Sequence, residues 1–131
     1  MSTAHEQLRA LLQRYAHAAD ERDIETLAGL FHPDAEISGT RGVQGLHEWL
    51  EAMRGPRAFP LSMHFIGDPL IELAPGEQEG RLDSYAVVYQ LSDRSSDNRD
   101  LTLGIRYVDL VVVYRGAWVF KQRTSTTLWM R

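Results

Sequence analysis

The stretch that decides the fold is LTLGIRYVDLVVVYRGAWVFKQRTSTTL, residues 101–128. It contains two long runs rich in β-branched and aromatic residues, 101–114 and 117–128, and only Arg115 and Gly116 lie between them. Runs of this kind predict strands, and a two-residue break that contains glycine predicts a tight hairpin. We therefore expect two long antiparallel strands here.

Two earlier segments have the same character and extend the predicted sheet. Residues 63–73 and 80–91 are rich in apolar residues, and Pro75 and Gly76 separate them. A polar stretch, residues 92–100, leads from the second run to residue 101. Four consecutive strands joined by short links predict an antiparallel meander.

The first half of the chain has helical spacing instead. Thr3 and Glu6 form a capping box, and apolar residues then recur every three or four positions as far as Asp20. Asp23 is a suitable N-cap for a second, shorter helix, which Pro33 would end. A short strand at 35–38 and a third amphipathic helix at 46–54 complete the predicted elements.

Helices that precede strands in the sequence favour an α+β domain. Because the apolar faces of the helices need a partner, we expect a curved sheet that wraps all three helices. A chain of 131 residues can bury one substantial core, so a single domain spanning 1–131 is sufficient.

The composition excludes several classes of function. The chain has no cysteine, which rules out disulfides and cysteine nucleophiles and favours a cytoplasmic protein. A net charge of −4 with scattered basic residues argues against a nucleic-acid partner. No stretch resembles a membrane span or an export signal, so we expect no membrane partner. The histidines show no metal-ligand spacing, and we expect no metal site.

One strand is apolar on both faces. In residues 105–114, alternation places Ile105 and Tyr107 on one face and Val108 and Leu110 on the other. The helices can cover only one face, and a strand with two apolar faces is normally covered on both. We therefore expect a homo-oligomer, a dimer or trimer, formed through the convex surface of the sheet.

Residues far apart in the chain carry the chemistry that we expect. His64 has a side chain that accepts and returns protons near neutral pH, and Asp20 would fix its tautomer through the other ring nitrogen. Arg123 stays charged and suits a developing oxyanion or a departing anion. Tyr15 could give its phenolic proton to a leaving hydroxyl. Together they predict removal of a proton and a leaving group from adjacent carbons, without a metal or an organic cofactor.

Each of these residues also has a purely structural interpretation. Asp20 lies at a helix end, where a carboxylate often only caps a helix, and a histidine in an apolar strand is more often a core residue. Arg123 could simply pair with Asp109 or Glu72. Tyr15 could fill volume in the core, as aromatic residues at helical spacing usually do.

Three segments carry a family resemblance. They are LLQRYAHAADERDIETLAGLFHPDAEI (residues 11–37), MHFIGDPLIEL (63–73) and RYVDLVVVYRGAWVFKQR (106–123). The chain resembles the SnoaL-like branch of the nuclear-transport-factor-2-like superfamily, which includes scytalone dehydratase, bile-acid dehydratase, hexachlorocyclohexane dehydrochlorinase and polyketide cyclases. The resemblance runs from about Leu8 to Arg123.

This resemblance implies a cone in which three helices fold over a strongly curved antiparallel sheet, around an apolar pocket that is open at one end. It implies a dehydratase-like lyase that acts on a small hydrophobic cyclic or polyketide-like molecule without a cofactor. The catalytic residues would be Tyr15, Asp20, His64 and Arg123. We expect the substrate pocket to be lined by Trp49, Phe59, Tyr85, Tyr107 and Asp109.

Other functions of the same fold remain open. Arg81, Asp83 and Asp109 resemble the Asp-Arg-Asp arrangement of limonene-epoxide hydrolase relatives, in which two carboxylates bridged by arginine activate a water. A cyclase, an isomerase, or a non-catalytic module that binds small molecules or assembles is also compatible with this fold.

Overall fold

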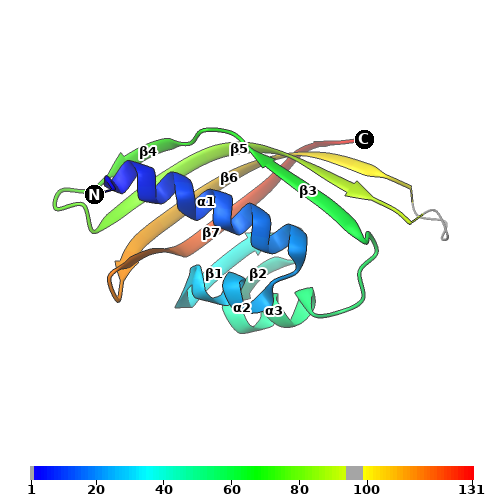
Figure 1. The fold of residues 1–131 in the computed structure, drawn as a ribbon, viewed down its shortest axis with the longest axis horizontal. Helices are drawn as coiled ribbons and strands as arrows, with labels where there is room; N and C mark the ends of the chain where they lie inside the picture. The colour runs from blue at the N-terminus through cyan, green and yellow to red at the C-terminus, as the bar shows by residue number, and fades with distance from the viewer. Residues whose placement is uncertain (1, 94–98) are drawn as a thin grey trace.

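The structure of the protein, a computed structural model, describes residues 2–93 and 99–131. In chain order, these residues form α1 (Ala4–Glu21), α2 (Ile24–Gly29), β1 (Phe31–Gly39), β2 (Gly42–Gly45), α3 (Leu46–Met53), β3 (Leu61–Ile66), β4 (Leu70–Leu73), β5 (Glu79–Leu91), β6 (Leu101–Tyr114) and β7 (Ala117–Met130) (Figure 1). The α+β class predicted from the sequence is confirmed. Residues 94–98 of the predicted polar link lie outside the described residues.

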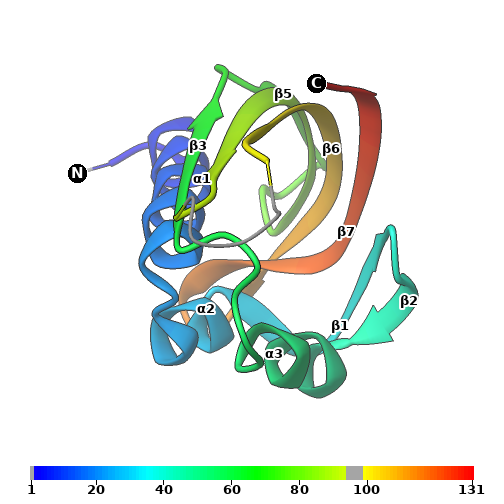
Figure 2. The same cartoon turned by 90° about the vertical axis from the view of Figure 1, so that its right-hand side faces the viewer.

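One curved, unclosed, mixed sheet forms the body of the molecule. Its described strands follow the order β2-β1-β7-β6-β5-β3, and β4 also pairs with β5. Strands β5, β6 and β7 are antiparallel neighbours, as predicted, and Arg115 and Gly116 make the turn between the last two. Figure 2 shows that these strands curl round and that the helices lie along the concave side.

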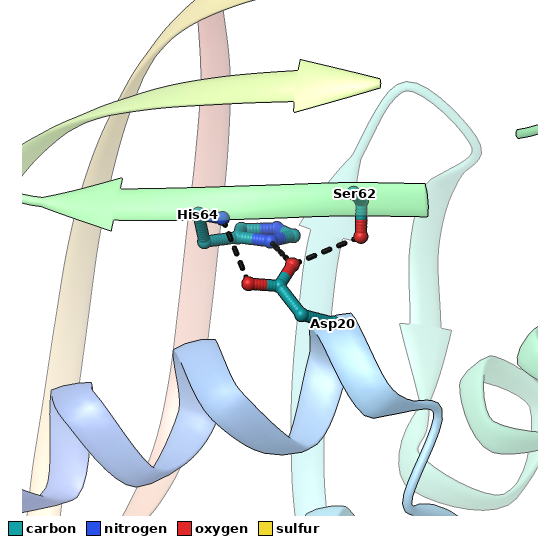
Figure 3. A network of polar contacts seen from close by, with 3 residues as sticks. All are labelled: Asp20, Ser62 and His64. Carbon is teal, nitrogen blue, oxygen red and sulfur yellow. Dashed lines mark hydrogen bonds and ion pairs between the residues drawn. The ribbon is translucent and has the colours of Figure 1, made fainter. Parts of the chain in front are cut away.

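Helix α1 begins at a side-chain cap and packs through one apolar face. The hydroxyl of Thr3 accepts a hydrogen bond from the backbone N–H of Glu6 at 3.1 Å, which satisfies a free amide of the first turn. Leu8, Leu12 and Tyr15, spaced by three or four residues, are buried. This face directs α1 onto the sheet, so its last turn lies beside β3 (Figure 3).

The segment at residues 63–73, predicted as one strand, forms two. β3 pairs with the second half of β5, and β4 pairs with the first half of the same strand. Between them, Gly67 donates its N–H to the carbonyl of Tyr85 at 2.8 Å, and Pro69 has no N–H to offer to a ladder. The prediction of a continuous strand was therefore wrong at residues 67–69.

The sheet also contains one parallel pair, which an antiparallel meander would not have. α2 ends at Gly29, earlier than predicted, so β1 begins at Phe31 and is longer than the strand we expected. Its ladder with β7 is irregular near Pro33, which supplies no N–H. Because β1 runs parallel to β7, Ile37 lies opposite Arg123, and the β1–β2 turn lies near the candidate site.

The hydrophobic core lies between α1 and the concave face of the sheet. Leu8 and Leu12 of α1, with Leu82, Val111 and Phe120 of the sheet, are almost completely buried. Burial of one such side chain contributes about 1.5–3 kcal/mol to stability. Among the described residues, no helix is long and apolar enough to cross a membrane.

Candidate active site

The carboxylate of Asp20 holds both the side chain and the backbone of His64. Oδ1 of Asp20 lies 2.6 Å from Nδ1 of His64, and Oδ2 accepts the backbone N–H of His64 at 2.9 Å (Figure 3). Asp20 belongs to the last turn of α1 and His64 to β3, so the packing of this helix on the sheet brings them together. The side chains are 21% and 14% exposed, which keeps most of the contact away from solvent.

Ser62 supplies a further hydrogen bond that the sequence analysis did not anticipate. Its Oγ donates to Oδ1 of Asp20 at 2.9 Å. Ser62 and His64 are two residues apart on β3, so strand periodicity places both on one face. That spacing is the signal that could have identified Ser62. With three donors, the carboxylate of Asp20 is held in a single orientation.

The surroundings of Asp20 favour its charged form. Burial opposes ionisation, but hydrogen bonds from the side chain and backbone of His64, and from Ser62, hold the pKa of Asp20 below its ordinary value. An ionised carboxylate only accepts, so the proton shared with Nδ1 belongs to the imidazole. In a neutral ring of this tautomer, Nε2 is the nitrogen that can accept a proton from another molecule.

Tyr15 contacts both the imidazole and a buried guanidinium. Its ring meets that of His64 edge-on, with centroids 6.0 Å apart, and Cζ of Arg123 lies 4.1 Å from its centroid. Tyr107 and Phe120 also border the guanidinium, at 3.8 and 4.7 Å from the same carbon. Aromatic faces attract a cation, and more strongly where water is excluded. The guanidinium of Arg123 is therefore held by three rings.

Arg123 and Asp109 form a buried ion pair between β6 and β7. They face each other in register, with Nε 3.0 Å from Oδ1. Burial raises the pKa of Asp109 to about 6, against the opposing pull of the Arg123 charge. Burial also disfavours the cation, but the carboxylate of Asp109 leads the contacts that hold the pKa of Arg123 above its ordinary value. Of the two partners considered from the sequence, Asp109 and Glu72, Arg123 pairs with Asp109.

The outer nitrogens of Arg123 remain available. Nη1 and Nη2 are buried and have no hydrogen-bond partner in the described part of the chain. Buried donors in proteins are nearly always satisfied, by protein, water or ligand. Two charged donors in a site from which water is largely excluded can stabilise negative charge on a bound molecule.

A cavity of about 240 Å³ opens beside these groups. Four of the predicted residues line it, from four different elements: Tyr15, Trp49, Tyr107 and Arg123. Burial raises the pKa of Tyr107 above its ordinary value, and Tyr15 adds to the rise, so this phenol stays protonated. The wall formed by β1, β2, the turn between them and β7 is polar, with Ser38, Thr40, Arg41, Gln44, Ser125 and Thr127. The cavity is thus apolar on one side and polar on the other.

The remaining predicted residues do not line this cavity. His64 is not among the lining residues, but its ring contacts Tyr15, which does line the cavity. Asp109 lies against Arg123 and has no exposed surface. Phe59 is half-buried in the link between α3 and β3. Among the described residues, no three His, Asp or Glu side chains gather as a metal ion would require.

Tyr85 lies on the opposite side of the sheet from these residues, so its predicted place in the pocket was wrong. On β5, Ser84 and Ala86 face the core, and strand alternation turns Tyr85 outward, where it is 62% exposed. There it borders a separate hollow of about 280 Å³ with Phe65 and Trp129.

Asp83 and Asp109 also lie on opposite faces of the sheet. Asp109 is opposite Leu82, a core residue, whereas Asp83 is the next residue of β5 and binds Arg106 at 2.6 Å on the outer face. Nη2 of Arg81 lies 3.6 Å from the same carboxylate. Carboxylates on opposite faces cannot activate one water, so the Asp-Arg-Asp arrangement is not formed by these residues.

Solved structures with the same fold carry several different names. A scytalone dehydratase-like protein from Novosphingobium aromaticivorans has a TM-score of 0.85 and 24% identity, covering 95% of this chain and 84% of that chain. The LinA-type3 hexachlorocyclohexane dehydrochlorinase from Novosphingobium barchaimii has a TM-score of 0.82 and 14% identity, covering 95% and 86%. A protein described as an aromatic ring hydroxylase from Novosphingobium aromaticivorans has a TM-score of 0.82 and 19% identity, covering 98% and 92%.

These identities are low enough that the likeness shows the fold alone, since one fold can host many reactions. No curated protein matches the chain. A family model described as a SnoaL-like domain matches residues 1–124, nearly the whole length. The chain therefore belongs to the SnoaL-like domain family.

Proposed function

We propose that this protein is a cytoplasmic, cofactor-independent lyase, a dehydratase or related eliminating enzyme, acting on a small hydrophobic cyclic or polyketide-like molecule. The observation that carries the proposal is the 2.6 Å contact between Oδ1 of Asp20 and Nδ1 of His64. This contact orients the imidazole to act as a base. The ring of Tyr15 contacts both that imidazole and the guanidinium of Arg123, whose outer nitrogens are buried donors. Membership of the SnoaL-like family supports the same class of reaction. So does the similarity in fold between this chain and structures named as a dehydratase and a dehydrochlorinase.

In this mechanism His64 takes a proton from a substrate carbon through Nε2. Asp20 stays ionised, keeps the tautomer and orientation of the ring, and stabilises the imidazolium that forms. A positioned base of this kind accelerates proton transfer by about 10²–10⁴-fold. The carbon to be deprotonated must lie at the edge of the cavity nearest Tyr15, since that residue joins the imidazole to the cavity wall.

The electron pair released by deprotonation forms a carbon–carbon double bond as the group on the neighbouring carbon leaves. Tyr15 gives its phenolic proton to a leaving hydroxyl, which departs as water, whereas a halide departs as an anion without that proton. Nη1 and Nη2 of Arg123 stabilise the negative charge that develops on a substrate oxygen or on the leaving group. The proton on His64 returns to Tyr15 or to solvent and restores the starting state.

The test is an elimination assay on a panel of β-hydroxy and β-chloro cyclic ketones. Mass spectrometry detects the reaction as loss of water or of hydrogen chloride from the substrate. We expect His64→Ala to abolish turnover and Asp20→Asn to lower kcat by about 100-fold or more, because the wrong tautomer then becomes accessible. His17→Ala and Asp34→Asn are matched controls, since both residues are exposed, and they should retain the wild-type rate.

Two outcomes would refute the lyase proposal. Full activity in His64→Ala would show that another group is the base. Tight binding of the panel without any elimination would identify a non-catalytic binding module, the alternative that this fold leaves open.

We also propose that the outer face of the sheet joins copies of this chain in a homo-oligomer. On that face Met63, Phe65 and Tyr85 are 53%, 70% and 62% exposed. Large contiguous apolar surfaces are rare on monomers and usually mark an interface. The other apolar face of the sheet is already covered by the helices (Figure 2).

Light scattering at micromolar concentration tests the assembly directly. We expect the mass of a dimer or trimer for the wild-type protein, and a monomer for Phe65→Glu combined with Tyr85→Glu. Val43→Glu is the matched control, because Val43 is 67% exposed on β2, at the far edge of the sheet. A monomeric wild-type protein would contradict the proposal.

A further inference from the structure

In the described part of the chain, Gln44 is the only buried residue of the cavity's polar wall. It is 8% exposed, whereas Ser38 and Ser125 are half-buried, and Thr40, Arg41 and Thr127 are exposed. Exposed polar side chains form hydrogen bonds with bulk water, but a buried one needs a fixed partner. The partner of Gln44 therefore has to lie inside the molecule or inside the cavity.

The inward position of Gln44 reverses the usual pattern of a half-buried strand. On β2, Val43 is 67% exposed, and the next residue, Gln44, is turned to the inner face of the sheet. Strands of this kind normally place apolar side chains inside and polar ones outside. A local rule that is broken without a structural gain is expected at functional sites.

The side-chain amide of Gln44 has no hydrogen-bond partner within residues 2–93 and 99–131. A primary amide carries two N–H donors and an oxygen that accepts. Polar groups as buried as this one are nearly always satisfied, by protein, water or ligand. Because Gln44 lines the cavity, a molecule bound there can supply the missing partner.

One row across the sheet holds Gln44, Ile37 and Arg123. Ile37 of β1 is opposite Gln44 of β2 on one side and opposite Arg123 of β7 on the other. Residues directly opposite each other share a face, and all three line the cavity. Neighbouring strands lie about 4.8 Å apart, so the backbones of Gln44 and Arg123 are about 10 Å apart. The row is polar at both ends and apolar in the middle.

We propose that Gln44 determines substrate specificity by binding an oxygen substituent of the substrate ring, on the side opposite the group that Arg123 stabilises. Ile37, which is 6% exposed, contacts the apolar part of the ring between the two. The preferred substituent is a hydroxyl, because a hydroxyl both donates and accepts hydrogen bonds, as the amide does. Such a site discriminates against an analogue without the hydroxyl, since the amide then stays unpaired.

This inference rests on the proposed function in one respect, since it takes the cavity as the substrate site. It narrows the substrate class to a ring that carries oxygen at two separated positions. One oxygen, or the leaving group, faces the outer nitrogens of Arg123, and the other oxygen faces Gln44. The binding role of Gln44 does not depend on whether His64 is the base.

Two ring ketones that differ at one position test the proposal without turnover. 4-Hydroxycyclohexanone and 4-methylcyclohexanone are titrated while the indole N–H signal of Trp49, which lines the cavity, is followed by NMR. The hydroxyl of the first probe is on the γ carbon, one carbon too far from the carbonyl for β-elimination. We expect the wild-type protein to bind the hydroxy ketone more tightly than the methyl ketone of similar size.

Gln44→Met assigns this preference to the amide, because it keeps the length of the side chain and removes its donors and acceptor. The ratio of the two dissociation constants should shift by about tenfold toward the methyl ketone. Gln44→Leu, which is also apolar, should shift the ratio in the same direction. Neither variant loses a hydrogen bond within the described residues, so the melting temperature should not fall. Gln13→Met, the same change at an exposed position of α1, is the matched control and should keep the wild-type ratio.

An unchanged ratio in Gln44→Met, or an equal loss of affinity for both ketones, would overturn the role of Gln44. His64→Ala separates this result from the proposed lyase activity. It should keep the wild-type ratio of affinities while elimination is lost, so failure of the lyase and failure of hydroxyl recognition are independently visible.

Discussion

Nε of Arg123 lies 3.0 Å from Oδ1 of Asp109, and the two side chains expose 1% and 0% of their surface. The pair joins β7 to β6, and Arg123 also lines the cavity. Desolvating two charges is expensive, and a close opposite charge offsets that loss only while both partners are present. The pair therefore holds the guanidinium in place for the site, at the risk of instability if either partner is lost.

Asp109→Asn should destabilise the protein by about 3–5 kcal/mol, because it leaves the buried charge of Arg123 without its partner. The double variant Asp109→Leu with Arg123→Met should recover most of that loss, since neither apolar side chain needs a counter-charge. It should still lack lyase activity. Urea unfolding measures both effects, and an Asp109→Asn variant as stable as the wild type would show that the pair is not needed for stability.

The lowered pKa of Asp20 predicts how stability depends on pH. The pKa of this carboxyl is lower in the folded protein than the ordinary value of 3.8. Its ionised form therefore stabilises the folded protein, and this contribution to the unfolding free energy is fully present above pH 3.8. That contribution is lost as the pH falls through the lower folded value. Asp20→Asn removes it, so the difference in unfolding free energy between variant and wild type should shrink below about pH 4. Urea unfolding at neutral and acidic pH checks this, and a difference that is constant with pH would exclude a role for the charge.

Tyr15→Phe should separate two kinds of leaving group. The ring contacts with Arg123 and His64 remain, so stability should change by only about 1 kcal/mol, the typical contribution of one hydrogen bond. Elimination of a hydroxyl should slow by about 10²–10⁴-fold, because its general acid is lost. Elimination of chloride should continue, since chloride needs no proton. Parallel rate measurements on matched hydroxy and chloro substrates decide this, and equal slowing of both would refute the role of Tyr15 as the acid.

Ser62 is a positioning residue in this mechanism, since it touches Asp20 and not the substrate. Ser62→Ala should lower kcat with little change in KM, because the carboxylate that orients His64 loses one of its three donors. Ser62→Thr keeps a hydroxyl at the same position and should restore the rate. An unchanged kcat in Ser62→Ala would show that the two hydrogen bonds from His64 are sufficient to orient the carboxylate of Asp20.

Local patterns were sufficient for most of the elements. Helical spacing and the Thr3 cap predicted α1, and apolar runs joined by Arg115 and Gly116 predicted β6 and β7. The errors concern pairing. The parallel contact of β1 with β7 and the break at residues 67–69 depend on which backbone groups meet across the sheet. Periodicity in one segment does not contain that information.

The same limit applies to the site. Residue chemistry identified Asp20 and His64 as a candidate pair, but their 2.6 Å contact exists only because the last turn of α1 packs against β3. Strand alternation places Tyr85 and its neighbours on opposite faces of β5, but alternation alone does not say which face is the inner one. Because Tyr85 and Asp83 lie on the outer face of the sheet, Tyr85 is outside the pocket and Asp83 is separated from Asp109, which lies on the inner face.

The sequence by itself determined the α+β class, the helical faces, the long hairpin and the chemical types available for acid, base and charge stabilisation. Those properties follow from interactions between residues a few positions apart. Only the tertiary structure decided that Asp20 meets His64 and that Arg123 is buried against Asp109. These arrangements depend on long-range packing, in which the burial of distant apolar faces fixes where each charge lies and what it meets.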